Sequence, residues 1–311
     1  MIAAEDRHAF CYLPLTIAER LGYFTVQGLD VQVVEKADPS QASQLMLNGG
    51  AQVMSVPFSA AIALHARGHQ VQSIVLQGRA PQLVLGVSMR TMGHFRDWRD
   101  LRGRRIAIPA AGSGPHRMAR LLLARSGIQG PQEVQYVPLS GAVEAAYAFR
   151  VGAVDALCYP DPLMTQLEQE GGLKVVADTR TPRGSEDVFG GPMPAACLCA
   201  PQDFVQAQPE ACQALSDAMV MALKWLQTAG PSDIIKVVPE PYFQGDRALY
   251  LAAFARAREA WAPDGLMPER GPLVAARVLS QFDNSEFLQR VALDKTFTNE
   301  FARRSKQRFR A

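Results

Sequence analysis

The chain has 311 residues, a length that predicts two domains at about 100 to 200 residues per domain. Apolar residues make up 48% and charged residues 20% of the sequence, which excludes a disordered, collagen-like or fibrous chain. The 32 basic and 30 acidic residues leave a formal charge of +2, so nucleic acid is not an expected partner. No apolar run approaches the roughly 18 to 20 residues that cross a bilayer.

Short β-branched segments alternate with longer segments of helical period, the pattern of α/β proteins with parallel sheets and crossover helices. In chain order, strands are predicted at 2–5, 31–35, 52–56, 71–77, 83–87, 105–108, 134–137, 156–158, 174–177 and 195–199. From residue 209 onward the sequence predicts helices at 209–230, 232–238, 246–260, 271–282 and 299–309, the first with an apolar stripe through Leu215, Met219, Ala222 and Leu226. The predicted fold class is therefore α/β with C-terminal helices.

Two stretches of the chain, 45–58 and 148–162, echo each other. Each predicts a helix that ends at glycine, a short strand, and a proline-containing loop that opens another helix, at 60–67 and 163–170. Two lobes built on one plan would give this echo, and so would the ordinary order of glycine and strand in α/β proteins.

The cysteines and histidines give no indication of a metal site. The five cysteines show no paired metal-ligand spacing, and Cys197 and Cys199 fall two residues apart in an apolar run, as buried thiols on one strand face would. His65 and His69 have a metal-like spacing without suitable carboxylates, and Gly68 between them indicates a helix end. We predict no metal and no cofactor.

The segment 106–117 predicts a buried strand, a loop of small residues and a helix start. Ser113 suits the N-cap position ahead of Pro115. Free amides and the helix dipole favour an anion at such a start, and Gly112 and Gly114 allow a ligand to approach the backbone. The alternative is that Ser113 only caps a helix.

Two kinds of chemistry find little support at this loop. Arg117 stands where a dinucleotide fingerprint has its third glycine, and no Gly-Lys-Ser/Thr follows. No Gly-x-Ser-x-Gly motif is present, so a hydrolase is not indicated. Acids at or after strand ends either accept hydrogen bonds from a ligand or are solvated loop carboxylates: Glu5, Asp6, Asp38 and Asp161.

Several segments together resemble one known family. They are residues 13–24 (LPLTIAERLGYF), 27–31 (QGLDV), 48–53 (NGGAQV), 101–108 (LRGRRIAI), the Gly112-Ser113-Gly114 helix start and 150–156 (RVGAVDA). In order and spacing they resemble solute-binding proteins of the nitrate/sulfonate/taurine transporter group, related to the thiamine-pyrimidine precursor family. The resemblance covers most of residues 1–200.

The resemblance implies a type II periplasmic-binding fold, in which two α/β lobes joined by a hinge enclose a ligand cleft. Lobe I would comprise residues 1–82 and 193–311, and lobe II residues 83–192, with crossings near 77–82 and 190–194. The first four strands and the last would belong to lobe I. The implied function is a monomeric, non-enzymatic periplasmic receptor that passes a small anionic or planar polar solute to an ABC permease of the inner membrane.

The resemblance also implies, by position, where the solute would bind. The regions are the loops after the first two strands, the end of the third strand, the helix start at 112–116, and the loop after the strand at 156–158. Aromatic side chains there, including Tyr12, would stack on a planar solute or belong to the core. The implied contacts are Asp6, Arg7, His8, Asp38, Ser55, Pro57, Phe58, Gly112, Ser113, Gly114, His116, Tyr159 and Asp161.

Two features depart from the family pattern. Relatives have Gly-Gly where this chain has Ala37-Asp38-Pro39, and the added negative charge disfavours a simple nitrate or sulfonate ligand. Relatives are exported, whereas Met1 directly precedes the first strand, so we expect that a leader peptide was removed. The alternatives are a thiamine-pyrimidine biosynthesis enzyme, disfavoured by few lysines and scattered cysteines, and a cytosolic small-molecule sensor, disfavoured by the lack of a helix-turn-helix extension.

Overall fold

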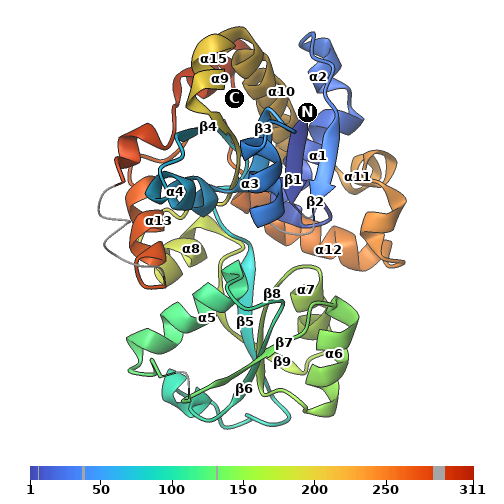
Figure 1. Ribbon diagram of the computed structural model, residues 1–311. Coiled ribbons are helices and arrows are strands. Elements are labelled where there is room, and N and C mark those ends of the chain that lie inside the picture. Colours follow the sequence, from blue (N-terminus) through green and yellow to red (C-terminus); the bar gives the residue numbers. More distant parts are fainter. Residues whose placement is uncertain (6, 37–38, 131, 283–290) are drawn as a thin grey trace.

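A computed structural model describes residues 1–5, 7–36, 39–130, 132–282 and 291–311, which form two lobes (Figure 1). Each lobe is built on one five-stranded sheet with helices packed against it. The predicted two-lobed α/β architecture is therefore confirmed. Within the described ranges, none of the helices combines the length and the apolar character of a membrane span.

The first sheet has the order β2-β1-β3-β10-β4, in which β10 runs antiparallel to both of its neighbours. Strand β1, which pairs in parallel with β2 and β3, is buried along Ile2, Ala3 and Ala4, as a parallel strand covered on both faces requires. The strands are β1 (Ile2–Glu5), β2 (Val33–Lys36), β3 (Val53–Pro57), β4 (Val71–Leu76) and β10 (Ala196–Pro201).

The second sheet has the order β7-β6-β8-β5-β9, in which β5 runs antiparallel to both of its neighbours. Its strands are β5 (Leu83–Ser88), β6 (Arg105–Ile108), β7 (Gln135–Pro138), β8 (Ala156–Pro160) and β9 (Leu173–Asp178). All ten predicted strands are present, each bound within two residues of the prediction, and they divide between the sheets as the resemblance implied.

The two sheets share one topology. In each, the middle strand (β3 or β8) lies between a parallel neighbour and an antiparallel strand that follows a crossing. A helix precedes and another follows this strand in both lobes: α3 (Pro39–Leu47) and α4 (Phe58–Ala66) around β3, α6 (Ala142–Val151) and α7 (Leu163–Gln169) around β8. The internal echo in the sequence therefore reflects two lobes with one plan.

The helices that follow β10 pack mainly against the first sheet. The predicted stripe on α10 (Pro209–Thr228), from Leu215 to Leu226, is buried in that core. α13 (Gly271–Leu279) instead lies between the lobes, because it contacts α4 while Val274 and Val278 pack with Val188 and Phe189 of α8 (Pro182–Phe189). Among the described residues of this region the other helices are α9 (Gln202–Ala207), α11 (Pro231–Val237), α12 (Arg247–Ala257) and α15 (Glu300–Phe309), with 3-10 turns η3 (Glu240–Phe243), η4 (Arg258–Ala260) and η5 (Leu293–Lys295).

The remaining helices follow strands within the two lobes. In the first lobe they are η1 (Phe10–Tyr12), α1 (Leu13–Arg20) and α2 (Tyr23–Val26), and in the second η2 (Trp98–Leu101) and α5 (Gly114–Arg125). The apolar residues of α5, including Met118, Leu121 and Leu122, are buried against the second sheet. The helix predicted to begin after the loop of small residues is thus present.

The chain crosses between the lobes twice, from β4 to β5 and from α8 to β10. The two crossing segments are hydrogen bonded to each other, since the amide of Ala195 donates to Gly78 O at 2.8 Å and that of Gly78 to Ala196 O at 3.1 Å. The first crossing is also fixed to η4, where the amide of Arg79 donates to Ala260 O at 2.8 Å. The residues at which each lobe ends, 82 and 193, stay a prediction.

Cys197, Cys199 and His65 take the predicted structural places. Cys197 and Cys199 are buried on one face of β10 with their Sγ atoms 3.4 Å apart, and this hydrogen bond together with burial raises the pKa of Cys199 well above its ordinary value. His65 lies in the last turn of α4, with Nε2 2.6 Å from Val71 O. In the described part of the chain, no group of three or more His, Cys, Asp or Glu residues is placed to hold a metal ion.

Two glycines in the first turns of helices in the second lobe differ in the space around them. A Cβ at Gly184 would lie 2.1 Å from Asp178 O, whereas one at Gly114 would meet only Leu83 Cδ1 at 3.6 Å. We expect Gly184→Ala to lower the free energy of unfolding by about 2 kcal/mol or more, because backbone must move, and Gly114→Ala to stay within about 0.5 kcal/mol of wild type. Urea unfolding of both variants checks this, and equal values would contradict it.

Candidate functional site

The carboxyl ends of the parallel strands in both sheets face the opposite lobe. The first residue of β10, Ala196, pairs with Pro57, the last residue of β3. In the same way Leu83, the first residue of β5, pairs with Pro160, the last residue of β8. Because β5 and β10 both begin directly after a crossing, these strand ends lie at the junction of the lobes. Ligands of open α/β sheets bind outside the carboxyl ends of the strands, so the loops after β1, β2, β3, β6, β7 and β8 form the candidate site.

The helix start of α5 is exposed, but several of its polar groups already have partners. The Gly112 amide donates to His116 Nδ1 at 2.8 Å, and the Ser113 hydroxyl donates to Ala110 O at 2.7 Å. Ser113 also caps the helix by accepting from the His116 amide at 3.4 Å. The attraction of this turn for an anion therefore rests on the helix dipole and the Gly114 amide, fewer donors than the sequence predicts.

His116 holds this turn as a neutral ring. Its Nδ1 accepts from the Gly112 amide, which requires a deprotonated Nδ1 and a proton on Nε2. Burial together with the charges of Arg120 and Arg117 lowers the pKa of His116, in agreement with that tautomer. The ring also packs edge-on against Tyr136, with centroids 4.5 Å apart. His116 therefore shapes the loop and carries no positive charge to a ligand at neutral pH.

The loop after β1 carries a cation that is already neutralised. The Arg7 guanidinium pairs with Glu19 of α1, and the Arg7 amide donates to Glu35 Oε1 at 3.1 Å. Glu35 lies in β2, next to its carboxyl end, and sequence reasoning missed it because a strand-end acid looks like any solvated carboxylate. Arg7 therefore adds little net charge to the site.

Two carboxylates and an aromatic pair complete this side of the site. Glu5 Oε2 accepts from the hydroxyl of Tyr12 at 2.5 Å, and burial and the charge of Glu5 raise the pKa of Tyr12 well above its ordinary value. His8 Nδ1 lies 3.7 Å from Glu35 Oε1, and its ring centroid is 4.4 Å from that of Tyr242. The first lobe thus presents carboxylates and a partly exposed ring at its strand ends.

Three predicted contacts are closed off by protein partners. Ser55 is fully buried and accepts from Gln77 Nε2 at 2.8 Å, and Phe58 is fully buried in the core. Tyr159 is 3% exposed, and its hydroxyl donates to Leu139 O at 2.6 Å. These side chains support the site from behind and do not line it in this conformation. Pro57 is partly exposed at the start of α4, while Asp6 and Asp38 lie outside the described residues.

Asp161 has a structural role in the second lobe. Its Oδ1 accepts from the Thr165 amide at 2.8 Å at the start of α7, and its Oδ2 lies 3.3 Å from Arg180 Nη1. Burial raises the pKa of Asp161, although Arg180 and Thr165 oppose that shift. With its side chain 2% exposed, this carboxylate is directed into protein and not toward solvent.

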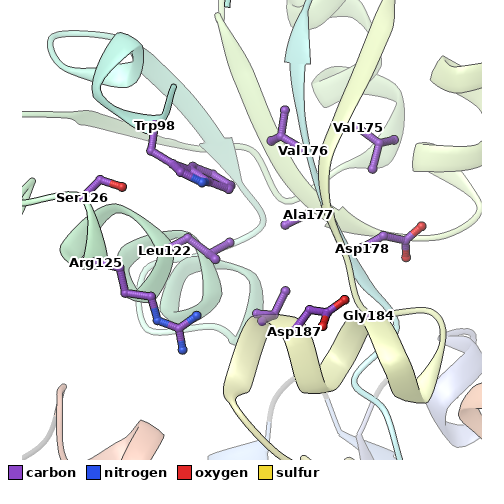
Figure 2. A pocket seen from close by; sticks show the side chains of 11 residues that line it. Trp98, Leu122, Arg125, Ser126, Val175, Val176, Ala177, Asp178, Gly184 and Asp187 are labelled. Carbon is purple, nitrogen blue, oxygen red and sulfur yellow. The ribbon is translucent and has the colours of Figure 1, made fainter. Parts of the chain in front are cut away.

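Two pockets lie apart from the loops that form the candidate site. One of about 510 Å³ is enclosed by α5, β9 and α8 in the second lobe, with Trp98 and Leu122 on one wall and Asp178 and Asp187 on another (Figure 2). The other, of about 680 Å³, lies among α2, α10 and α15. Neither pocket is lined by a predicted contact residue, so the candidate site is defined by the loops after β1, β2, β3, β6, β7 and β8 and not by these cavities.

Comparisons with known proteins define the class. Residues 9–230 match the family model described as NMT1/THI5 like, and the chain belongs to this family. Its fold is that of periplasmic solute-binding proteins: the periplasmic aliphatic sulphonate binding protein SsuA from Escherichia coli superposes with a TM-score of 0.72 at 16% identity, over 94% of this chain and 90% of that one.

Two further proteins match most of the chain at higher sequence identity. A solved structure from Bordetella bronchiseptica RB50 is 38% identical, with a TM-score of 0.88 over 100% of this chain and 97% of that one. The Bacillus subtilis (strain 168) protein named "Putative binding protein YtlA" is 22% identical over 270 residues, 86% of this chain and 78% of that protein.

One similar protein is an enzyme by name. The 4-amino-5-hydroxymethyl-2-methylpyrimidine phosphate synthase of Uromyces fabae is 31% identical over 100 residues, 32% of this chain and 29% of that protein. Proteins similar to this chain thus carry the names of binding proteins and of a synthase.

The neutral state of His116 makes the turn sensitive to pH. The pKa of His116 lies below the ordinary value of about 6.5. The hydrogen bond from Gly112 therefore stabilises the fold fully above pH 6.5, and this contribution is lost as the pH falls through the lowered pKa. We expect His116→Ala to cost about 0.5 to 1 kcal/mol at pH 7.5 and less at pH 5. Urea unfolding at both values checks this, and a difference that grows toward pH 5 would contradict it.

Proposed function

We propose that this protein is a periplasmic receptor that binds one small polar solute between its lobes and delivers it to an ABC permease of the inner membrane. The observation that carries the proposal is that the carboxyl ends of both sheets meet across two crossing segments. A solute held by both sets of loops would make contacts that only the closed arrangement offers, and would therefore shift the hinge equilibrium toward it. The receptor acts as a monomer in this proposal.

The charges at the site support a planar polar solute over a simple anion. Glu5 and Glu35 accept hydrogen bonds at the first lobe, where Arg7 is already paired with Glu19. Carboxylates at this edge favour a solute that presents hydrogen-bond donors or positive charge there. The ring of His8, with its side chain 43% exposed, offers a flat surface for stacking, and the α5 dipole suits a carbonyl-like group on the opposite side.

The polar groups of the second lobe support binding without turnover. His116 is engaged by Gly112, and Asp161 is engaged by Thr165 and Arg180, so neither is free to move a proton on a solute. The second candidate is a pyrimidine-synthase type of enzyme, which the 100-residue similarity to the Uromyces fabae protein favours. Product formation in place of saturable binding would distinguish it.

A thermal-shift screen over sulfonates, nitrate, dicarboxylates, aromatic acids and pyrimidine precursors tests the proposal. A solute of the right class raises the midpoint of unfolding, and at 100 times Kd it stabilises the protein by about 2.7 kcal/mol. We expect the hit to come from the planar polar compounds and to make the molecule more compact in X-ray scattering. No compaction by a stabilising solute would contradict hinged closure.

Variants then locate the bound solute. Gly114→Trp places a bulky ring at the open turn of α5, and Glu35→Gln removes charge from the first lobe, so each should weaken binding tenfold or more by loss of about 1.4 kcal/mol. Ser126→Ala, at the other end of α5, is the matched control and should bind as wild type does. Unchanged affinity in the first two variants would place the solute elsewhere.

A further inference from the structure

An ion pair joins the two lobes outside the crossing segments. α12 belongs to the first lobe, because Tyr250, Ala253 and Phe254 are buried in its core, and α7 belongs to the second lobe through its own buried apolar face. Arg256 on α12 pairs with Glu168 on α7, and the two helices face each other where the lobes meet (Figure 1). This pair therefore exists only while the lobes keep this arrangement.

Glu168 is part of a cluster organised by one buried guanidinium. Arg180 is 4% exposed, and its Nη1 lies 3.0 Å from Glu168 Oε2 and 3.3 Å from Asp161 Oδ2. Its Nη2 lies 2.5 Å from Asp178 Oδ2. Three carboxylates thus surround one cation, and Arg256 supplies the second positive charge from the other lobe. Without Arg256 the cluster would hold two more negative than positive charges.

The cluster makes the interlobe pair stronger than an ordinary surface ion pair. Arg180 already fixes Glu168, so pairing with Arg256 orders fewer side-chain rotamers than two free side chains would. The Glu168 side chain is 20% exposed, and water screens it less than it screens a fully solvated carboxylate. The pair is not the sole contact between the described parts of the two lobes, because Val274 and Val278 of α13 also pack with α8.

We propose that Arg256 and Glu168 form an interlobe latch that sets the resting separation of the lobes in the absence of solute. The latch regulates the candidate site, because Asp161, at the other end of the cluster, directly follows β8 at the site's edge. In this respect the inference rests on the proposed function. A receptor whose lobes are held near the closed arrangement binds with a higher apparent affinity, since a larger fraction of molecules is competent to bind.

A distance measured between the lobes without solute tests the latch. Val26 in the first lobe and Val143 in the second are 67% and 84% exposed, so cysteines there accept spin labels in a Cys11→Ser background. We expect Arg256→Gln to add a second, more separated population, with the ratio of separated to latched molecules rising about fivefold, the effect of losing one ion pair. Pulsed electron resonance gives that ratio, and X-ray scattering gives a larger radius of gyration.

The control is Arg247→Gln on the same helix. Arg247 pairs with Glu240 of η3 within the first lobe, so its loss should leave the distance distribution unchanged. Arg256→Gln should add nothing further in a Glu168→Gln background. A folded Arg256→Gln variant with the wild-type distribution, or an equal shift in Arg247→Gln, would overturn the latch. The measurement uses no solute, so failure of the solute screen leaves it intact, and failure of the latch leaves the solute screen intact.

Discussion

The arrangement of this molecule depends on the direction of the two strands that follow the crossings. β5 and β10 each enter a sheet next to the end of a parallel strand and run antiparallel to it. Since the ladder hydrogen bonds of β8 and β3 fix these strands along their length, the crossings must leave both sheets at their carboxyl ends. The loops of the candidate site are therefore placed opposite one another by backbone pairing, before any side chain contributes.

Many of the described polar groups around the strand ends are balanced by neighbours, and the proposed solute follows from this balance. Glu19 neutralises Arg7, Arg180 neutralises Asp161, and His116 satisfies Gly112. The first lobe presents the carboxylates of Glu5 and Glu35 and the ring of His8 beside these pairs, while the second lobe presents the N-terminus of α5. The proposed solute, with donors on one side and an acceptor on the other, would suit both lobes, whereas a small inorganic anion would suit only the helix dipole.

The fold could be predicted closely because its signals are local. Short β-branched runs and glycine or proline at helix ends gave all ten strands and the stripe on α10. The contacts around the site were harder to predict because the partners are distant in sequence. The hydroxyl of Tyr159 donates to the carbonyl of Leu139, 20 residues away, and Arg256 pairs with Glu168, 88 residues away. Aromatic residues expected to stack on a solute, Phe58 among them, are core residues, since position along the chain does not reveal which face a side chain takes.

The strand order also determines which lobe can be finished first on the ribosome. The second sheet has all its strands once β9 ends at Asp178, but the first sheet lacks β10 between β3 and β4 until Pro201 has been made. The sheet of the lobe that contains the N-terminus is therefore completed later than the other sheet. Until β10 has been made, the edges of β3 and β4 that pair with it stay unpaired in the nascent chain, although the second sheet is already complete. Unpaired strand edges of this kind can pair with other chains, and a chaperone that binds them would prevent this.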